Sequence, residues 1–175
     1  RGAFEYQGQK CSAASRLYIP DTLYERWFQE MAEMLETVKM GDVQDFTNFL
    51  NAVIDEESFN RIKGYIDFAR NSTSAEIVLG GNCDDSLGYF IQPTVIKTTD
   101  PLFKTMQEEI FGPVLTVFVY PEKDYSKVLE LCDKTSPYGL TGSIFAQDRK
   151  AILEANNVLR HSAGNFYIND KPTGA

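Results

Sequence analysis

Hydrophobic patterning in the last third of the chain constrains the fold most strongly. Three short apolar runs typical of strands alternate with two stretches whose apolar residues have helical spacing. The strands are expected at residues 114–120, 142–146 and 165–169, and the helices at residues 124–134 and 148–160. Strands that alternate with helices favour parallel pairing through right-handed crossovers. We therefore predict an α/β fold with a mostly parallel sheet flanked by helices.

Two helices and three extended segments are expected earlier in the chain. The helices cover residues 21–39 and 56–70, and the extended segments cover residues 76–81, 89–91 and 94–96. Asp21 is typical of a helix N-cap, and Gly41 of a residue that follows a helix end. Pro93 has no backbone N–H to donate, so the region around it is expected at an edge or a bend of the sheet.

Composition limits the classes of partner. With 175 residues, 43% of them hydrophobic, the chain is long enough for one well-packed domain, which we expect to cover residues 1–175. A net charge of −8 argues against nucleic acid or anionic membrane surfaces as partners. The apolar run at residues 114–120 is too short to span a bilayer, so we expect no membrane insertion.

Cys11 is the candidate nucleophile. A thiolate adds to a carbonyl carbon and then carries the acyl group, which aldehyde oxidation requires. Small residues surround Cys11, Lys10 supplies a positive charge beside it, and its backbone N–H is placed to stabilise an oxyanion. The alternative is that Cys11 packs as a small hydrophobic residue. We interpret Cys83, which follows Asn82 and precedes two aspartates, and Cys132, on an apolar helical face, as structural.

The spacing of the cysteines argues against a disulfide framework and against a zinc site. Three well-separated cysteines do not suggest a disulfide framework, and no spacing typical of a zinc site occurs. His161 lies at the end of an expected helix, where a surface role is favoured over catalysis. We therefore expect no metal site.

A second motif, Glu-Glu-Ile-Phe-Gly-Pro, occupies residues 108–113. Taken alone, its two glutamates are typical of a solvated pair before a strand. Taken with four other segments in the same order, it resembles the aldehyde dehydrogenase superfamily over essentially the whole chain. Those segments are residues 4–11, which end in Gly-Gln-Lys-Cys, and residues 138–140, 145–148 and 164–169.

This resemblance implies a role for three residues. Cys11 falls on the catalytic nucleophile, Glu109 on the carboxylate that binds the nicotinamide ribose of NAD, and Phe111 on the aromatic residue beside the nicotinamide. A carboxylate accepts two ribose O–H bonds well, and an aromatic side chain fixes the ring. Glu108 is expected to be structural.

The resemblance implies a small-molecule substrate, and a narrower resemblance concerns which one. Residues 8–13, 113–115 and 163–171 are similar to the branch of the superfamily that oxidises glutamate γ-semialdehyde to glutamate in proline catabolism. Ser12, Gly174 and Ala175 then fall on the residues that anchor the α-carboxylate of the substrate, largely through backbone N–H groups. Some members carry Ser where this chain has Ala175. Alanine has no hydroxyl, so we expect one side-chain hydrogen bond to be absent here. The alternative for residues 172–175 is a frayed terminus.

The resemblance also implies what the chain lacks. The family's cofactor-binding domain, its general-base glutamate and its oxyanion-stabilising asparagine are expected upstream of Cys11. We therefore expect this chain alone to be inactive. The resemblance also implies that the whole enzyme is a dimer in the mitochondrial matrix. The choice between NAD and NADP stays open, because the selecting residues are expected in that upstream domain. Two alternatives also remain open: another aldehyde dehydrogenase, including one that acylates coenzyme A, and a non-catalytic structural protein of the same fold.

Overall fold

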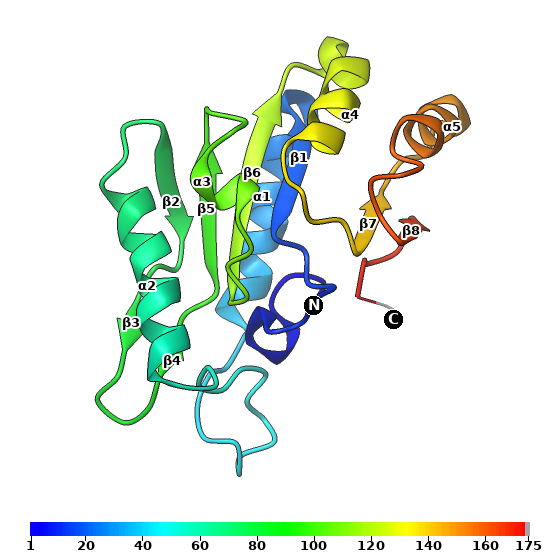
Figure 1. Cartoon of the computed structure of the whole chain (residues 1–175). Helices are drawn as coiled ribbons and strands as arrows, with labels where there is room; N and C mark the ends of the chain where they lie inside the picture. The colour runs from blue at the N-terminus through cyan, green and yellow to red at the C-terminus, as the bar shows by residue number, and fades with distance from the viewer. Residues whose placement is uncertain (174–175) are drawn as a thin grey trace.

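The computed structural model describes residues 1–173 (Figure 1). The helices are α1 (Asp21–Glu36), α2 (Glu56–Arg70), α3 (Lys104–Gln107), α4 (Tyr125–Lys134) and α5 (Arg149–Val158), with short 3-10 turns η1 (Glu5–Gly8) and η2 (Glu122–Asp124). The strands are β1 (Arg16–Pro20), β2 (Ala75–Leu79), β3 (Cys83–Asp84), β4 (Phe90–Ile91), β5 (Thr94–Thr98), β6 (Val114–Tyr120), β7 (Thr141–Ile144) and β8 (Asn165–Ile168). Within these residues, none of the helices has both the length and the apolar character needed to cross a membrane.

The main sheet has the strand order β1-β6-β5-β2. Strand β6 pairs in parallel with β1 on one side and with β5 on the other, whereas β2 runs antiparallel to β5. The prediction of a mostly parallel sheet flanked by helices is confirmed. β1 was not predicted, because a five-residue run that ends in Pro20 has little strand character by itself.

The two faces of the sheet are covered by different helices, as Figure 1 shows for α1 and α2. Successive residues of a strand point to opposite faces, so Val95 and Ile96 of β5 enter different cores. Ile96 packs in the core that contains Ile62 and Ile66 of α2. Val95 packs in the core that contains Tyr24 of α1. The sheet is therefore buried on both faces, which parallel strands require.

One part of the strand prediction is wrong. Strands β7 and β8 pair in parallel with each other, as expected, but they form a separate two-stranded sheet. The reason is that both edges of β6 are already occupied by β1 and β5. The β7–β8 unit instead has its own small core, made by α4 and α5 around Leu129, Ala155 and Leu159.

Helix boundaries follow local hydrogen bonds. α2 spans the predicted range, and Asp55 caps it by accepting a hydrogen bond from the Ser58 N–H at 2.8 Å. α1 ends at Glu36, well before Gly41. At this helix end the Thr37 hydroxyl donates to the Met34 carbonyl at 2.7 Å. Asp21 is the first residue of α1 rather than its N-cap.

Pro93 marks a bend but not an edge of the sheet. It lies between β4 and β5, and β5 is paired on both sides, by β6 and by β2. The missing N–H of Pro93 is tolerated because the pairing of β5 begins one residue later, where the Thr94 N–H donates to the Pro113 carbonyl at 2.9 Å. A proline directly before a central strand therefore costs no ladder hydrogen bond.

Candidate functional site

Cys11 lies in the turn that joins η1 to β1, and its side chain is exposed. The turn is closed by a hydrogen bond from the Ala13 N–H to the Lys10 carbonyl at 3.0 Å. Ser12 beside it is only 6% exposed, and its carbonyl accepts a bond from the Thr141 hydroxyl at 3.3 Å. The thiol is therefore open to a small molecule, while the residue after it is held by the start of β7.

The three residues at the end of η1 share a left-handed backbone. Tyr6, Gln7 and Gly8 have φ angles of 57°, 58° and 65°. For residues with a Cβ this conformation costs about 1–2 kcal/mol each. Strain of this kind persists only where surrounding contacts determine the backbone, and it gathers at functional sites.

Two glutamines supply contacts that hold this turn. The Gln7 side-chain N–H donates to the Ala52 carbonyl at 3.1 Å, and the Gln9 side-chain oxygen accepts from the Ile54 N–H at 2.9 Å. Both bonds tie the cysteine segment to the loop before α2, 45 residues away. Sequence reasoning missed this role, because the partners are backbone groups that no sequence pattern reveals.

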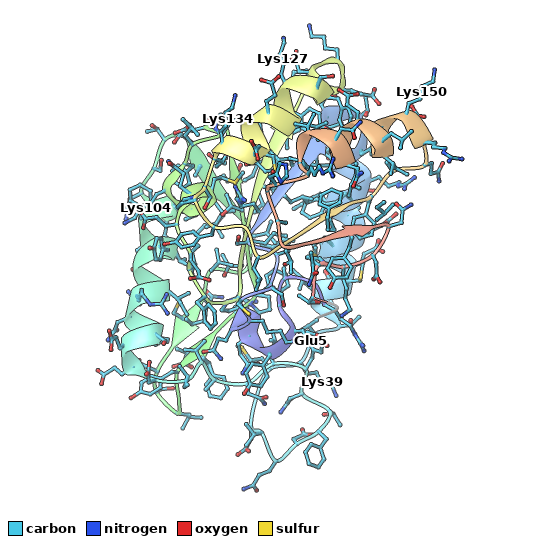
Figure 2. All side chains as sticks on the ribbon, turned by 45° about the vertical axis from the view of Figure 1, so that its right-hand side comes forward. Glu5, Lys39, Lys104, Lys127, Lys134 and Lys150 are labelled. Atoms are coloured by element: carbon cyan, nitrogen blue, oxygen red, sulfur yellow. The ribbon has the colours of Figure 1, made fainter. Side chains whose placement is uncertain are left out.

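Lys10 makes a contact that the sequence did not indicate. Its ammonium group lies 2.9 Å from a carboxylate oxygen of Glu5, which Figure 2 labels on the N-terminal segment. The hydrogen bond from Lys10 lowers the pKa of Glu5. The positive charge expected to act on Cys11 is thus partly neutralised by Glu5.

The segment 108–113 leads directly into β6, and its residues differ in environment. Ile110 is 1% exposed, and the Glu108 carboxylate accepts a hydrogen bond from the Tyr65 hydroxyl at 2.6 Å. Glu109 is exposed, and Phe111 is 39% exposed with a φ of 55°. Among residues 1–173, no hydrogen bond or ion pair involves the Glu109 side chain. Glu109 and Phe111 are therefore presented outward while their neighbours are anchored.

The cysteine segment and the segment 108–113 meet at two glycines. A Cβ added to Gly8 would overlap the carbonyl oxygen of Gly112, so the two backbones are in direct contact. A Cβ on Gly112 would in turn overlap the side chain of Ile62. The contact follows from the topology, because both segments precede neighbouring parallel strands, β1 and β6.

The candidate site does not lie where functional groups of open parallel sheets usually gather, at the carboxyl ends of the strands. Cys11 instead precedes the amino end of β1, and Glu109 and Phe111 precede the amino end of β6. The structure brings these three residues to the same edge of the main sheet.

The segment after β8 returns to the cysteine segment. A Cβ on Gly2 would lie 3.5 Å from side-chain atoms of Lys171 and Pro172, and the Gly2 carbonyl accepts a bond from the Ala14 N–H at 2.9 Å. Thr173 is 5% exposed. Gly174 and Ala175, which we expected at a carboxylate anchor, lie outside the described residues.

The other two cysteines have environments that disfavour a thiolate. Burial, and then the negative charge of Asp67, raise the pKa of the Cys83 thiol. The acidic residue that acts is thus on α2 rather than adjacent in sequence. Burial raises the pKa of the Cys132 thiol, which packs against the α4–α5 core. In residues 1–173, no group of three or more His, Cys, Asp or Glu side chains is arranged to hold a metal ion.

The profile of the aldehyde dehydrogenase family matches residues 1–175. The chain belongs to the aldehyde dehydrogenase family. Among its relatives, the mitochondrial delta-1-pyrroline-5-carboxylate dehydrogenases of Danio rerio and Homo sapiens are 59% and 52% identical to it over its whole length. The chain is also similar to a solved structure, the crystal structure of the delta-pyrroline-5-carboxylate dehydrogenase of Mycobacterium tuberculosis bound with NAD. The match covers the whole of this chain, with a TM-score of 0.92 and 44% sequence identity.

The matched region is a part of each family member. The chain covers 32% of the Danio rerio protein, 31% of the human protein and 31% of the Mycobacterium tuberculosis chain. It thus spans about a third of the length of these aldehyde dehydrogenases.

The glycine contact gives a stability prediction. We expect Gly8→Ala to lower the free energy of unfolding by more than about 1 kcal/mol, because the new Cβ meets the Gly112 carbonyl at a left-handed position. Gly64→Ala is the matched control: Gly64 lies inside α2 with open space around it, so alanine should stabilise the chain by about 0.5–1 kcal/mol. Urea denaturation measures both, and equal effects would contradict the contact.

The exposure of the thiols gives a second prediction. At neutral pH, iodoacetamide should label Cys11 faster than Cys83 or Cys132, because Cys11 is exposed and burial raises the pKa of the other two thiols. Mass spectrometry of the folded chain measures each rate. Labelling in urea is the control, where the three rates should converge. Faster labelling of Cys83 or Cys132 in the folded chain would count against Cys11 as the nucleophile.

Proposed function

We propose that this chain is the cysteine-bearing part of an enzyme that uses NAD to oxidise L-glutamate γ-semialdehyde, which forms from Δ1-pyrroline-5-carboxylate, to L-glutamate in proline catabolism. The observation that carries the proposal is the meeting of two motifs at one edge of the sheet. There the exposed thiol of Cys11 and the outward-facing Glu109 and Phe111 are joined by the contact of Gly8 with Gly112. The names of the relatives support the choice of substrate.

Cys11 is the proposed nucleophile. Its thiolate adds to the aldehyde carbon, and the backbone N–H of Cys11 is the proposed donor to the resulting oxyanion. After oxidation the acyl group is held on the sulfur as a thioester, which water cleaves to give the acid. The left-handed turn at residues 6–8 fixes the approach of this segment, so the thiol does not have to be ordered when the substrate binds.

Glu109 and Phe111 are the proposed contacts to NAD. The residues fit that cofactor, because the Glu109 carboxylate is exposed and engages no other group within residues 1–173, and the Phe111 ring is partly exposed two positions away. A free carboxylate accepts two ribose hydroxyl bonds, and an aromatic face packs against a nicotinamide. Bound NAD supplies the hydride acceptor for the reaction.

Ser12, Gly174 and Ala175 are the proposed anchor for the α-carboxylate of the substrate. Ser12 directly follows the nucleophile and is nearly buried, so its position is fixed. Lys171 and Pro172, just before the proposed anchor, lie against Gly2, whose carbonyl accepts a hydrogen bond from the Ala14 N–H in the cysteine segment. Backbone N–H groups of a glycine-containing loop bind carboxylates without competing side chains.

We further propose a mitochondrial-matrix location and a homodimer for the full-length protein. The location rests on relatives that are named as mitochondrial. The dimer rests on the family resemblance.

Substitution of the cofactor contact and of the nucleophile should have different effects in the full-length protein. Glu109→Gln removes a charge-assisted hydrogen bond worth about 1.5–3 kcal/mol, so KM for NAD should rise about tenfold to a hundredfold. Cys11→Ala should abolish turnover and leave NAD binding intact. Steady-state kinetics and calorimetric NAD titration measure these effects.

The control for this experiment is Glu130→Gln, which changes a glutamate of α4 whose side chain is 69% exposed. It should leave both constants unchanged. An unchanged KM for NAD in Glu109→Gln would mean that Glu109 is a surface carboxylate. Turnover by Cys11→Ala at the wild-type rate would show that Cys11 is not the nucleophile.

Substrate preference tests the carboxylate anchor. If buried donors bind the α-carboxylate, the full-length protein should prefer glutamate γ-semialdehyde to an aliphatic aldehyde of equal length by up to about 10⁴-fold in kcat/KM. The reason is that an aldehyde without the α-carboxylate leaves those donors unpaired. Equal values for the two aldehydes would contradict the proposed substrate and leave the aldehyde dehydrogenase activity standing. Detection of acyl-CoA rather than glutamate as the product would assign the chain to the CoA-acylating class.

A further inference from the structure

Helix α2 makes three separate contacts with the segment 108–113. The Tyr65 hydroxyl donates to the Glu108 carboxylate at 2.6 Å, and the Arg61 guanidinium donates to the Ile110 carbonyl. Ile62 packs against Gly112 so closely that no side chain fits at that glycine. Tyr65 follows Ile62 by three positions and Arg61 by four, which places the three residues on one side of the helix.

These contacts hold positions 108, 110 and 112, and none of the three involves the side chain of Glu109 or Phe111. The backbone of Glu108 is extended, with φ −98° and ψ 149°, and successive side chains of such a backbone point in opposite directions. At positions 110 and 112 the helix meets the Ile110 carbonyl and the backbone of Gly112. Glu109 and Phe111 are left exposed.

The anchoring also accounts for the backbone of Phe111. A left-handed φ of 55° at an aromatic residue is unfavourable and persists only where neighbouring contacts fix the chain. Here the Arg61 bond fixes the residue before Phe111, and the contacts of Gly112 with Ile62 and Gly8 fix the residue after it.

We propose that α2 is a platform that positions the NAD-binding residues, with Tyr65 and Arg61 as its positioning residues. This inference rests on the proposed function, since it gives the two side chains a role in the reaction only if Glu109 and Phe111 bind NAD. Neither residue touches the reacting atoms. They hold positions 108 and 110, so Glu109 and Phe111 meet the cofactor already oriented, and no binding energy is used to order them.

The surroundings of Tyr65 keep this bond in place over the physiological pH range. Lys104, which Figure 2 labels on the side of the molecule where α2 lies, is 5.0 Å from the centre of the Tyr65 ring and 4.0 Å from a Glu108 carboxylate oxygen. Burial, and then the hydrogen bond to Glu108, raise the pKa of Tyr65 to about 12. The hydroxyl therefore remains a donor, and Glu108 has a cation beside it.

Tyr65→Phe in the full-length protein tests the platform. It deletes one hydroxyl and should raise KM for NAD about threefold to tenfold while kcat and KM for the aldehyde stay within twofold. Glu108→Gln weakens the same bond from its other end and should have the same effect. The double variant should be no worse than either single one, because both changes remove one interaction.

Tyr125→Phe is the matched control. It also deletes a tyrosine hydroxyl that makes one hydrogen bond, to the Ala151 carbonyl at 2.8 Å, but between α4 and α5. It should lower stability by a similar amount and leave KM for NAD unchanged. A Tyr65→Phe variant whose KM for NAD moves no more than that of Tyr125→Phe would overturn the proposal.

Glu109→Gln separates the two levels of inference. If that variant raises KM for NAD and Tyr65→Phe does not, the platform fails and the NAD contact stands. If Glu109→Gln itself leaves KM for NAD unchanged, the NAD contact fails and the platform fails with it. Additive losses in the Tyr65→Phe, Glu108→Gln double variant would show that the two residues act separately, which also contradicts the proposal.

Discussion

The backbone contact between Gly8 and Gly112 is the constraint on which the candidate site depends. It joins a segment that carries a thiol to a segment that carries a carboxylate and an aromatic ring, although about a hundred residues separate them. The approach requires glycine at position 8, where a Cβ would overlap the Gly112 carbonyl oxygen, and glycine at position 112, where a Cβ would overlap the side chain of Ile62. Every other feature of the site is arranged around this junction.

The parallel sheet creates the junction. Because β1 and β6 are parallel neighbours, the segments that precede them emerge at the same edge, and β6 is fixed in turn by β5 on its other side. The two helices that cover the sheet then act differently. α1 closes one face, whereas α2 closes the other and also grips the segment 108–113 through Tyr65, Arg61 and Ile62. A helix that supplies core packing thus also fixes the segment that carries Glu109 and Phe111.

Local strain is concentrated in the same places. The non-glycine residues with left-handed backbones in residues 1–173 are Tyr6, Gln7, Phe111 and Asn169, and all lie in the segments that resemble family motifs. Such strain has a free-energy cost that a well-packed core offsets. Its location indicates that the rest of the fold, with its two large cores, holds these segments in geometries that they would not adopt alone.

The sequence by itself determined the fold class, the position of α2, and the identity of the exposed cysteine as the candidate nucleophile. The first two follow from the spacing of apolar residues, and the third follows from the small residues around Cys11 together with the family resemblance. It did not determine that residues 141–144 and 165–168 form a separate sheet, since that depends on β1 and β5 occupying both edges of β6. Only the tertiary structure decided that the site lies at the amino ends of the strands, that Lys10 pairs with Glu5, and that Glu108 bonds Tyr65. Those facts depend on contacts between residues distant in sequence or on backbone groups, and neither leaves a pattern in the chain.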